Sequence, residues 1–280
     1  MIIMHLIKKE VKELKRMSAI PIYQVDAFSE KLFSGNPAAI CIVKEWLPEE
    51  IMQSIASENN LSETAFVNIS LNPFYIRWFT PECEMGLCGH ATLASARILF
   101  DEYLEKNSSE ITFQANRGTL RAVKEKNLIY LDFPKDTPIP VEIDDKIKEA
   151  LQLKPRLLFK GIDDYLAILN SEEDVKRLEL DFDKISQLDA RGLIVSSPSV
   201  TTDFVCRCFY PNSKINEDPV TGSAHTLLAP YWAKELKKKS LTSYQCSERG
   251  GFLNCSLIED RVLIGGSSVR YMSGTINVPT

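Results

Sequence analysis

One sequence pattern occurs twice in this chain, and this repeat constrains the fold more than any other feature. The first copy runs from Arg-Trp-Phe-Thr-Pro at Arg77, through Cys-Gly-His-Ala-Thr at Cys88 and an apolar helix pattern, to an Asn-Arg-Gly triplet. The second runs from Arg-Cys-Phe-Tyr-Pro at Arg207, through Thr-Gly-Ser-Ala-His at Thr221 and another helix pattern, to a Glu-Arg-Gly triplet. Two copies indicate one duplicated domain rather than a solenoid of three or more short units. Because equivalent loops of facing halves can converge, the sequence predicts a site between them.

The composition is typical of a globular protein without a polyanionic partner. The 280 residues are enough for two domains that each bury a core. Hydrophobic residues make up 44% and charged residues 25%, as in soluble globular proteins. The net charge is −5 and the basic residues are scattered, so we expect neither nucleic acid nor a membrane as partner. The basic run Lys237–Lys239 ends a predicted helix and is interpreted as a solvated terminus.

The cysteines and the N-terminus indicate the compartment. Seven cysteines, an odd number, are scattered through apolar segments, which favours reduced thiols in the cytoplasm over a disulfide framework. No apolar run approaches the length of a membrane span. In the first 16 residues the apolar stretch precedes the charges, the reverse of a signal peptide. We therefore expect an N-terminal extension over residues 1–18, or translation from a start upstream of Met17.

The first half, residues 19–133, is predicted to be mostly strands. Apolar runs and period-2 patterns predict strands at residues 20–27, 38–43, 64–69, 74–80, 111–115, 119–124 and 128–133. One helix begins at Pro48 and has a single apolar face. A second helix, over residues 89–103, is apolar on most sides, so we expect it to lie inside a curled sheet.

The second half, residues 141–280, repeats this plan after a proline-rich linker over residues 134–140. Its predicted strands lie at residues 156–160, 165–170, 192–197, 203–210, 243–247, 252–258 and 261–265. Its buried helix is predicted over residues 222–238, with a kink at Pro230. We leave open the return of a C-terminal strand to the first half. Strands outnumber helices and hairpin-length connections dominate, so the expected class is α+β with mostly antiparallel sheets.

Glu63 is the first candidate for chemistry. It opens an apolar strand, where partial desolvation favours the neutral carboxyl and moves its proton affinity toward the working pH of an acid/base. The alternative is an ordinary charge at a strand edge. His90 lies at the start of the first buried helix, whose positive dipole end opposes imidazolium, so a neutral catalytic or capping histidine is expected. His225, further into the second helix, is interpreted as a packed or solvent-facing histidine.

The two glycine-containing helix starts are the second candidate. Gly89 and the run Gly222–Ala224 each offer backbone N–H groups to an anion, and small residues let a ligand approach closely. Asp218, just before Pro219, is either a turn residue or part of the site. The cysteine spacing predicts no metal site, and the chain lacks a dinucleotide or phosphate-loop glycine motif and a Gly-x-Ser-x-Gly elbow. We therefore expect no metal and no cofactor.

With these residues in view, the chain resembles the phenazine-biosynthesis PhzF-like family, within the diaminopimelate-epimerase fold. The resemblance covers about residues 23–265 and is carried by several short segments: V-D-A-F from Val25, G-N-P-A-A-I from Gly35, N-L-S-E-T-A-F-V from Asn60, R-W-F-T-P from Arg77, L-C-G-H-A-T-L-A from Leu87, N-E-D-P-V-T-G-S-A-H from Asn216 and A-P-Y-W-A from Ala229. It implies two epimerase-like domains, each a sheet wrapped around a central helix, with the site in the cleft between them.

The resemblance also implies roles for particular residues. In the family's isomerase, the glutamate of the E-T-x-F-V motif moves a proton between carbons of a cyclic dihydro-hydroxyanthranilate, and this position is Glu63. The G-H histidine and the aspartate of E-D-P-x-T-G-S-A, here His90 and Asp218, hold and polarise the substrate. Substrate binding is assigned to five residues: Asn36, Gly89, Gly222, Ser223 and Ala224. The expected ligand is a small-molecule carboxylate, and a homodimer is common for such folds.

Two alternatives stay open beside this isomerase. Related epimerases use two opposed thiols, one at each helix start. Cys88 matches the first position, but Thr221 occupies the second, and a hydroxyl cannot replace a thiol as acid or base. A two-base epimerase or racemase would therefore pair Cys88 with Glu63. The other alternative is a non-catalytic protein of the same fold that binds a small molecule. Because the two-thiol pair is incomplete, Cys88 is otherwise expected to be a small buried residue at the cleft wall.

Overall fold

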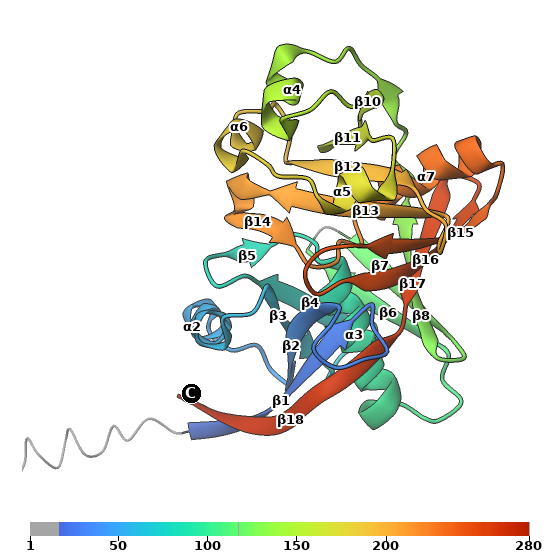
Figure 1. Ribbon diagram of the computed structural model, residues 1–280. Helices are drawn as coiled ribbons and strands as arrows, with labels where there is room; N and C mark the ends of the chain where they lie inside the picture. The colour runs from blue at the N-terminus through green and yellow to red at the C-terminus, as the bar shows by residue number, and fades with distance from the viewer. Residues whose placement is uncertain (1–16, 117, 280) are drawn as a thin grey trace, which may run out of the picture.

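A computed structural model describes residues 17–116 and 118–279, and Figure 1 shows their arrangement. Hydrogen bonds connect eighteen strands into one curled system, mostly antiparallel, around two central helices. The class is α+β, as predicted. Within these described ranges, no helix has both the length and the apolar character needed to cross a membrane.

The first half is built around the helix α3 (Gly89–Ile98), which a π-helical turn, η2 (Leu99–Tyr103), continues. Eight of its ten residues are buried because the sheet curls around it, and the prediction of an interior helix over residues 89–103 is confirmed. A shorter helix, α2 (Glu49–Asn59), covers the outside. The strands are β1 (Met17–Ala27), β2 (Asn36–Val43), β3 (Glu63–Asn68), β4 (Phe74–Phe79), β5 (Glu84–Met85), β6 (Glu110–Ala115), β7 (Gly118–Glu125) and β8 (Leu128–Pro134).

The second half is built in the same way around α7 (His225–Leu236), which contains Pro230. Three overlapping turns that begin at residues 222–224 lead into α7, and this helix begins three residues later than predicted. The strands are β9 (Ile139–Pro140), β10 (Leu157–Lys160), β11 (Asp164–Ile168), β12 (Gly192–Pro198), β13 (Phe204–Tyr210), β14 (Ile215–Asp218), β15 (Ser240–Gln245), β16 (Gly251–Ile258) and β17 (Arg261–Gly266). Short helices lie outside: α4 (Asp145–Leu151), α5 (Glu172–Lys176), α6 (Phe182–Ser186) and η3 (Pro211–Ser213).

Two strand pairings join the halves. β17 pairs antiparallel with β8, and the last strand, β18 (Ser268–Pro279), pairs antiparallel with β1. In Figure 1 this red strand runs along the blue first strand. The largest hydrophobic cluster also spans both halves, since it contains Phe28 and Phe133 together with Val220. The junction is therefore packed core, and the division into two domains with a linker over residues 134–140 stays a proposal.

Candidate active site

Glu63 lies in the interior, at the first position of β3. This strand pairs in parallel with β2, where Ala38 is its partner, and all six residues of β3 are buried. Only 8% of Glu63 is exposed, and its Oε2 lies 3.1 Å from Nε2 of His90. The carboxylate therefore faces the start of α3 and not solvent.

His90 and Cys88 come from the start of α3, where Cys88 is the residue before the first turn. The Cys88 Sγ lies 3.5 Å from Nδ1 of His90, so the imidazole has the thiol on one edge and Glu63 on the other. Burial, reinforced by Glu63, raises the pKa of the Cys88 thiol, which keeps it protonated. Burial opposes charge on His90 too, but its neighbours Cys88 and Glu63 raise its pKa. Because Cys88 stays a neutral thiol, Glu63 is the neighbour whose negative charge acts on the ring.

This electrostatic balance corrects the expectation of a neutral His90. The helix dipole alone disfavours imidazolium, but the fold adds a carboxylate 3.1 Å from the ring. An opposite charge at that distance favours the charged form of a histidine. The structure therefore favours an imidazolium paired with the Glu63 carboxylate.

Asp218 ends β14 and is held by a residue of the first half. Its Oδ1 accepts a hydrogen bond of 2.8 Å from Nδ2 of Asn36, and its Oδ2 accepts one of 2.5 Å from Oγ1 of Thr221. The fully buried Asn36 also donates to the carbonyl of Val220 at 2.9 Å. Burial, opposed by His90 and reinforced by Glu63, raises the pKa of Asp218 to about 6. Asp218 is therefore electrostatically coupled to the Glu63–His90 pair.

The two glycine-containing helix starts meet at the junction of the halves. A Cβ placed on Gly89 would lie 3.8 Å from Cα of Gly222 and 4.0 Å from the backbone nitrogen of Ser223. No side chain caps α3, and none caps α7, whose N-cap residue is the buried Ala224. The N–H groups at such helix ends are the ones that bind anions. All eight residues predicted for the site thus lie at or beside this junction.

His225 is a packed histidine. It is fully buried, its Nδ1 lies 2.9 Å from the carbonyl of Thr221, and its Nε2 lies 2.7 Å from Oγ of Ser243. Burial lowers the pKa of His225 to about 4. The neutral ring therefore donates from Nδ1 and accepts from the serine, and it holds the turn in front of α7.

Two residues of the site were missed from the sequence. The fully buried Gln245 donates from Nε2 to the carbonyl of Asp218 at 2.7 Å and accepts from the N–H of Thr221 at 2.8 Å. Arg191 pairs with Asp164, and its Nη2 lies 3.5 Å from Oγ of Ser223. No local pattern marks Gln245, which ends an ordinary strand. The half-exposed Arg191 follows Asp189-Ala190 in a loop, and loops often carry functional residues, so the sequence did offer a signal for this cation.

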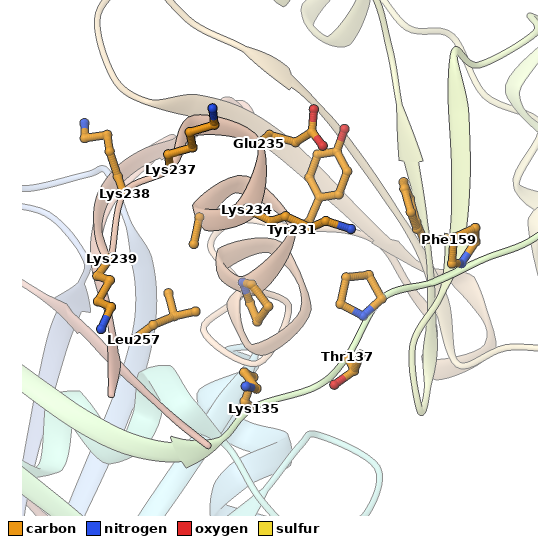
Figure 2. A pocket seen from close by; sticks show the side chains of 14 residues that line it. Lys135, Thr137, Phe159, Tyr231, Lys234, Glu235, Lys237, Lys238, Lys239 and Leu257 are labelled. Atoms are coloured by element: carbon orange, nitrogen blue, oxygen red, sulfur yellow. The ribbon is translucent and has the colours of Figure 1, made fainter. Parts of the chain in front are cut away.

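A separate cavity of about 560 Å³ lies at the other end of α7, and none of the predicted site residues lines it. Its wall combines Phe159 and Tyr231 with several lysines. Figure 2 shows that the side chains of Lys237, Lys238 and Lys239 point in different directions instead of converging. Lys238 is paired with Asp203. This arrangement matches the predicted solvated helix terminus.

The fold is of the epimerase-like class, and curated relatives of this chain are named isomerases. The chain belongs to the phenazine biosynthesis-like (PhzC-PhzF) family, whose model matches residues 25–274. A protein of Pseudomonas aeruginosa named an uncharacterized isomerase is 46% identical over 92% of this chain and 99% of its own length. The mouse phenazine biosynthesis-like domain-containing protein 2 is 41% identical, with the same coverage.

Solved structures agree with this assignment. The crystal structure of a PhzF-family phenazine biosynthesis protein from Enterococcus faecalis is 44% identical, with a TM-score of 0.90 over 92% of this chain and 99% of the other. A hydroxyproline epimerase from Agrobacterium vitis has a TM-score of 0.60 at 9% identity, covering 95% and 94% of the two chains. That last likeness shows the shared fold alone.

Proposed function

We propose that this chain is a cofactor-independent isomerase that moves a proton between two carbons of a small carboxylate-bearing substrate, with Glu63 as both acid and base. The observation that carries the proposal is the position of Glu63, which is buried at the junction of the halves and 3.1 Å from His90. A base acts best where its partners are fixed and water is excluded. The isomerase names of the similar relatives support the same reaction class.

In the proposed reaction, the Glu63 carboxylate takes a proton from a carbon next to a carboxyl or unsaturated group. The electron pair of the broken C–H bond moves onto that group, and Glu63 then delivers a proton to a second carbon. In D₂O this proton is deuterium whenever the Glu63 carboxyl has exchanged with solvent before delivery. No atom is gained or lost, and no oxidant or reductant is needed. When Glu63 is protonated, the His90 imidazolium faces the negative charge that develops on the substrate.

Substrate binding is assigned to the junction. Asn36 and Asp218 provide polar contacts beside His90, and the N–H groups around Gly89 and Gly222–Ala224 face the substrate carboxylate. Removing one backbone donor of this kind costs other enzymes roughly 3–4 kcal/mol in the transition state. Because the two glycines are nearly in contact, we expect the two helix starts to move apart for the substrate to enter.

The first alternative is a two-base epimerase that uses Cys88 and Glu63. Two bases that flank one carbon, each about 3–3.5 Å from it, would stand roughly 6–7 Å apart. Ligand atoms of Glu63, Cys88 and His90 all lie within 4.8 Å of one another, which leaves no room for a carbon between thiol and carboxylate. The second alternative, a binding protein without catalysis, is disfavoured by the inward-facing Glu63.

The test is solvent exchange. The protein is incubated in D₂O with a panel of small carboxylates that have activated C–H bonds, dihydro-hydroxyanthranilate among them, and deuterium in the product is measured by mass spectrometry. We expect Glu63→Gln to lower exchange by about 10²–10⁴-fold, the usual contribution of one acid/base. A folded variant that retains exchange would end the proposal.

Cys88→Ala separates the two catalytic schemes in the same assay. Under the proposal the variant loses less than about tenfold, because Glu63 carries the proton in both directions. Under the two-base scheme it loses exchange as severely as Glu63→Gln.

We also propose that the protein acts in the cytoplasm, in line with its unpaired described cysteines. We further propose that it forms a homodimer, which light scattering will test.

A further inference from the structure

Three different ligand types meet beside the junction of the halves. Oε2 of Glu63 and Nε2 of His90 are both shielded from solvent, and neither makes a hydrogen bond to any described residue. The two atoms lie 3.1 Å apart, which is close enough for a hydrogen bond. The N–H of the ring does not point at the carboxylate oxygen at an angle that a hydrogen bond requires. Sγ of Cys88 lies 3.5 Å from Nδ1 of the same histidine. The pair is held by charge without an aligned hydrogen bond, and a ligand that binds both atoms gives each the directed bond that it lacks.

We propose that Glu63, Cys88 and His90 form a binding site for one divalent cation of Zn²⁺ type. The ligand set of one carboxylate, one thiolate and one imidazole suits this borderline-soft ion, whereas Mg²⁺ and Ca²⁺ prefer oxygen alone. Three protein ligands leave a fourth position for water, as in open zinc sites. Zinc sites are usually recognised by the spacing of their ligands in the sequence. That spacing does not reveal this site, because Glu63 lies on β3 whereas Cys88 and His90 lie at the start of α3.

The geometry requires a small adjustment. Zinc bond lengths of about 2.0–2.3 Å place tetrahedral ligand atoms roughly 3.3–3.6 Å from one another. The three ligand atoms here all lie within 4.8 Å of one another, with Glu63 and His90 already at 3.1 Å. One ion takes only one ring nitrogen, so either the thiol or the carboxylate closes toward the nitrogen that is used. A rotamer adjustment of about an ångström is sufficient for that closure.

The charges balance when the ion binds. The sulfur coordinates as thiolate and the histidine as neutral imidazole, so the protons of the Cys88 thiol and of the imidazolium pass to solvent. The carboxylate and the thiolate then neutralise the two positive charges of the ion. A bound ion occupies the Glu63 oxygen that the proposed isomerase needs, so zinc would inhibit it; this consequence alone rests on the proposed function.

The test measures binding without any turnover. Metal-free full-length protein is titrated with Co²⁺, which gives a near-ultraviolet charge-transfer band when a thiolate coordinates it, and Zn²⁺ is then added as competitor. We expect one ion per chain, a thiolate band that Zn²⁺ abolishes, and no competition from Mg²⁺. In Cys88→Ala the band disappears, and the affinity for Zn²⁺ falls by more than the roughly 10–100-fold that loss of an outer-shell partner costs.

Cys83→Ala is the matched control, because Cys83 is an exposed cysteine five positions before Cys88. It keeps both the band and the affinity. A wild-type protein without a thiolate band, a band that survives in Cys88→Ala, or a band that is lost in Cys83→Ala would each overturn the proposal. Circular dichroism verifies folding, and Cys88→Ser gives the same readout if the alanine variant does not fold. The result is independent of Glu63 catalysis, which the exchange assay decides separately.

Discussion

The starts of α3 and α7 are equivalent positions of a duplicated fold, yet they differ in what surrounds their histidines. His90 follows Gly89 directly and faces Glu63, whereas His225 lies three residues after Gly222 and faces Ser243 and a backbone carbonyl. The duplication thus supplies two similar backbone turns. One turn holds its histidine against a buried carboxylate, and the other holds its histidine among neutral hydrogen-bond partners.

The same difference appears in the electrostatics. Burial disfavours the charged form of both rings. His90 has an anionic neighbour that reverses this effect and raises its pKa, while His225 has only neutral hydrogen-bond partners, so its pKa falls to about 4. One ring is therefore suited to stabilise negative charge, and the other stays neutral at physiological pH.

The largest expected effect separates the two histidines by activity. His90→Gln removes the cation beside Glu63, and we expect solvent exchange to fall by about 10²–10³-fold, the usual loss when one group that stabilises developing charge is removed. His225→Gln breaks two buried hydrogen bonds, and we expect it to lower the free energy of unfolding by about 1–3 kcal/mol. Exchange assays and urea denaturation of both variants provide the comparison. Equal losses of exchange in two folded variants would show that the two helix starts share the chemistry.

The second expected effect is a pH dependence of stability that belongs to His225. An unfolded histidine titrates near pH 6.5 and the folded one near 4, so the unfolded chain binds more protons in that window. Stability from this group is present above pH 6.5 and is lost as the pH falls toward 4, by on the order of 3 kcal/mol. Measured from pH 8 to pH 4, the unfolding free energy of the wild type should fall by that amount relative to that of His225→Gln, so the wild type loses its advantage over the variant. A difference independent of pH would contradict a neutral buried ring.

The sequence predicted the parts of this comparison that depend on local pattern. The helix over residues 89–103 could be placed because it is apolar on most sides, and only an interior helix has that composition. The repeated Gly-containing motif predicted that the helix starts converge, and Gly89 and Gly222 are nearly in contact. The short helices α4, α5 and α6 were missed because five to seven residues hold too little periodicity, although the Ser171 capping box was a readable signal.

The sequence could not predict which distant segments of the chain approach one another in space. The Glu63–Cys88–His90 cluster requires β3 to lie beside the start of α3, and the charge of His90 follows from that approach and not from the helix alone. Gln245 acts on Asp218 and Thr221 from a strand more than twenty positions along the chain. Nothing next to Gln245 in sequence distinguishes it from a surface glutamine.

The smallest expected effect concerns Asp218, which belongs to the second half but titrates under the influence of the first. An ordinary aspartate has a pKa near 3.8, and burial raises that of Asp218 to about 6, so here the folded state binds more protons between these values. Asp218 therefore contributes to the stability of the fold below pH 3.8, where it is neutral, and this contribution is lost as the pH rises through 6. The sign is opposite to that of the His225 effect. The two pH dependences partly cancel in the wild type, and single variants are needed to reveal them.

Asp218→Asn should therefore raise the free energy of unfolding at pH 8 by about 1–2 kcal/mol. This gain is less than the full pKa shift of Asp218 implies, because one hydrogen bond is weakened. The gain should vanish near pH 4, and a variant that is less stable at pH 8 would show that the hydrogen bonds from Asn36 and Thr221 outweigh the cost of burying the charge.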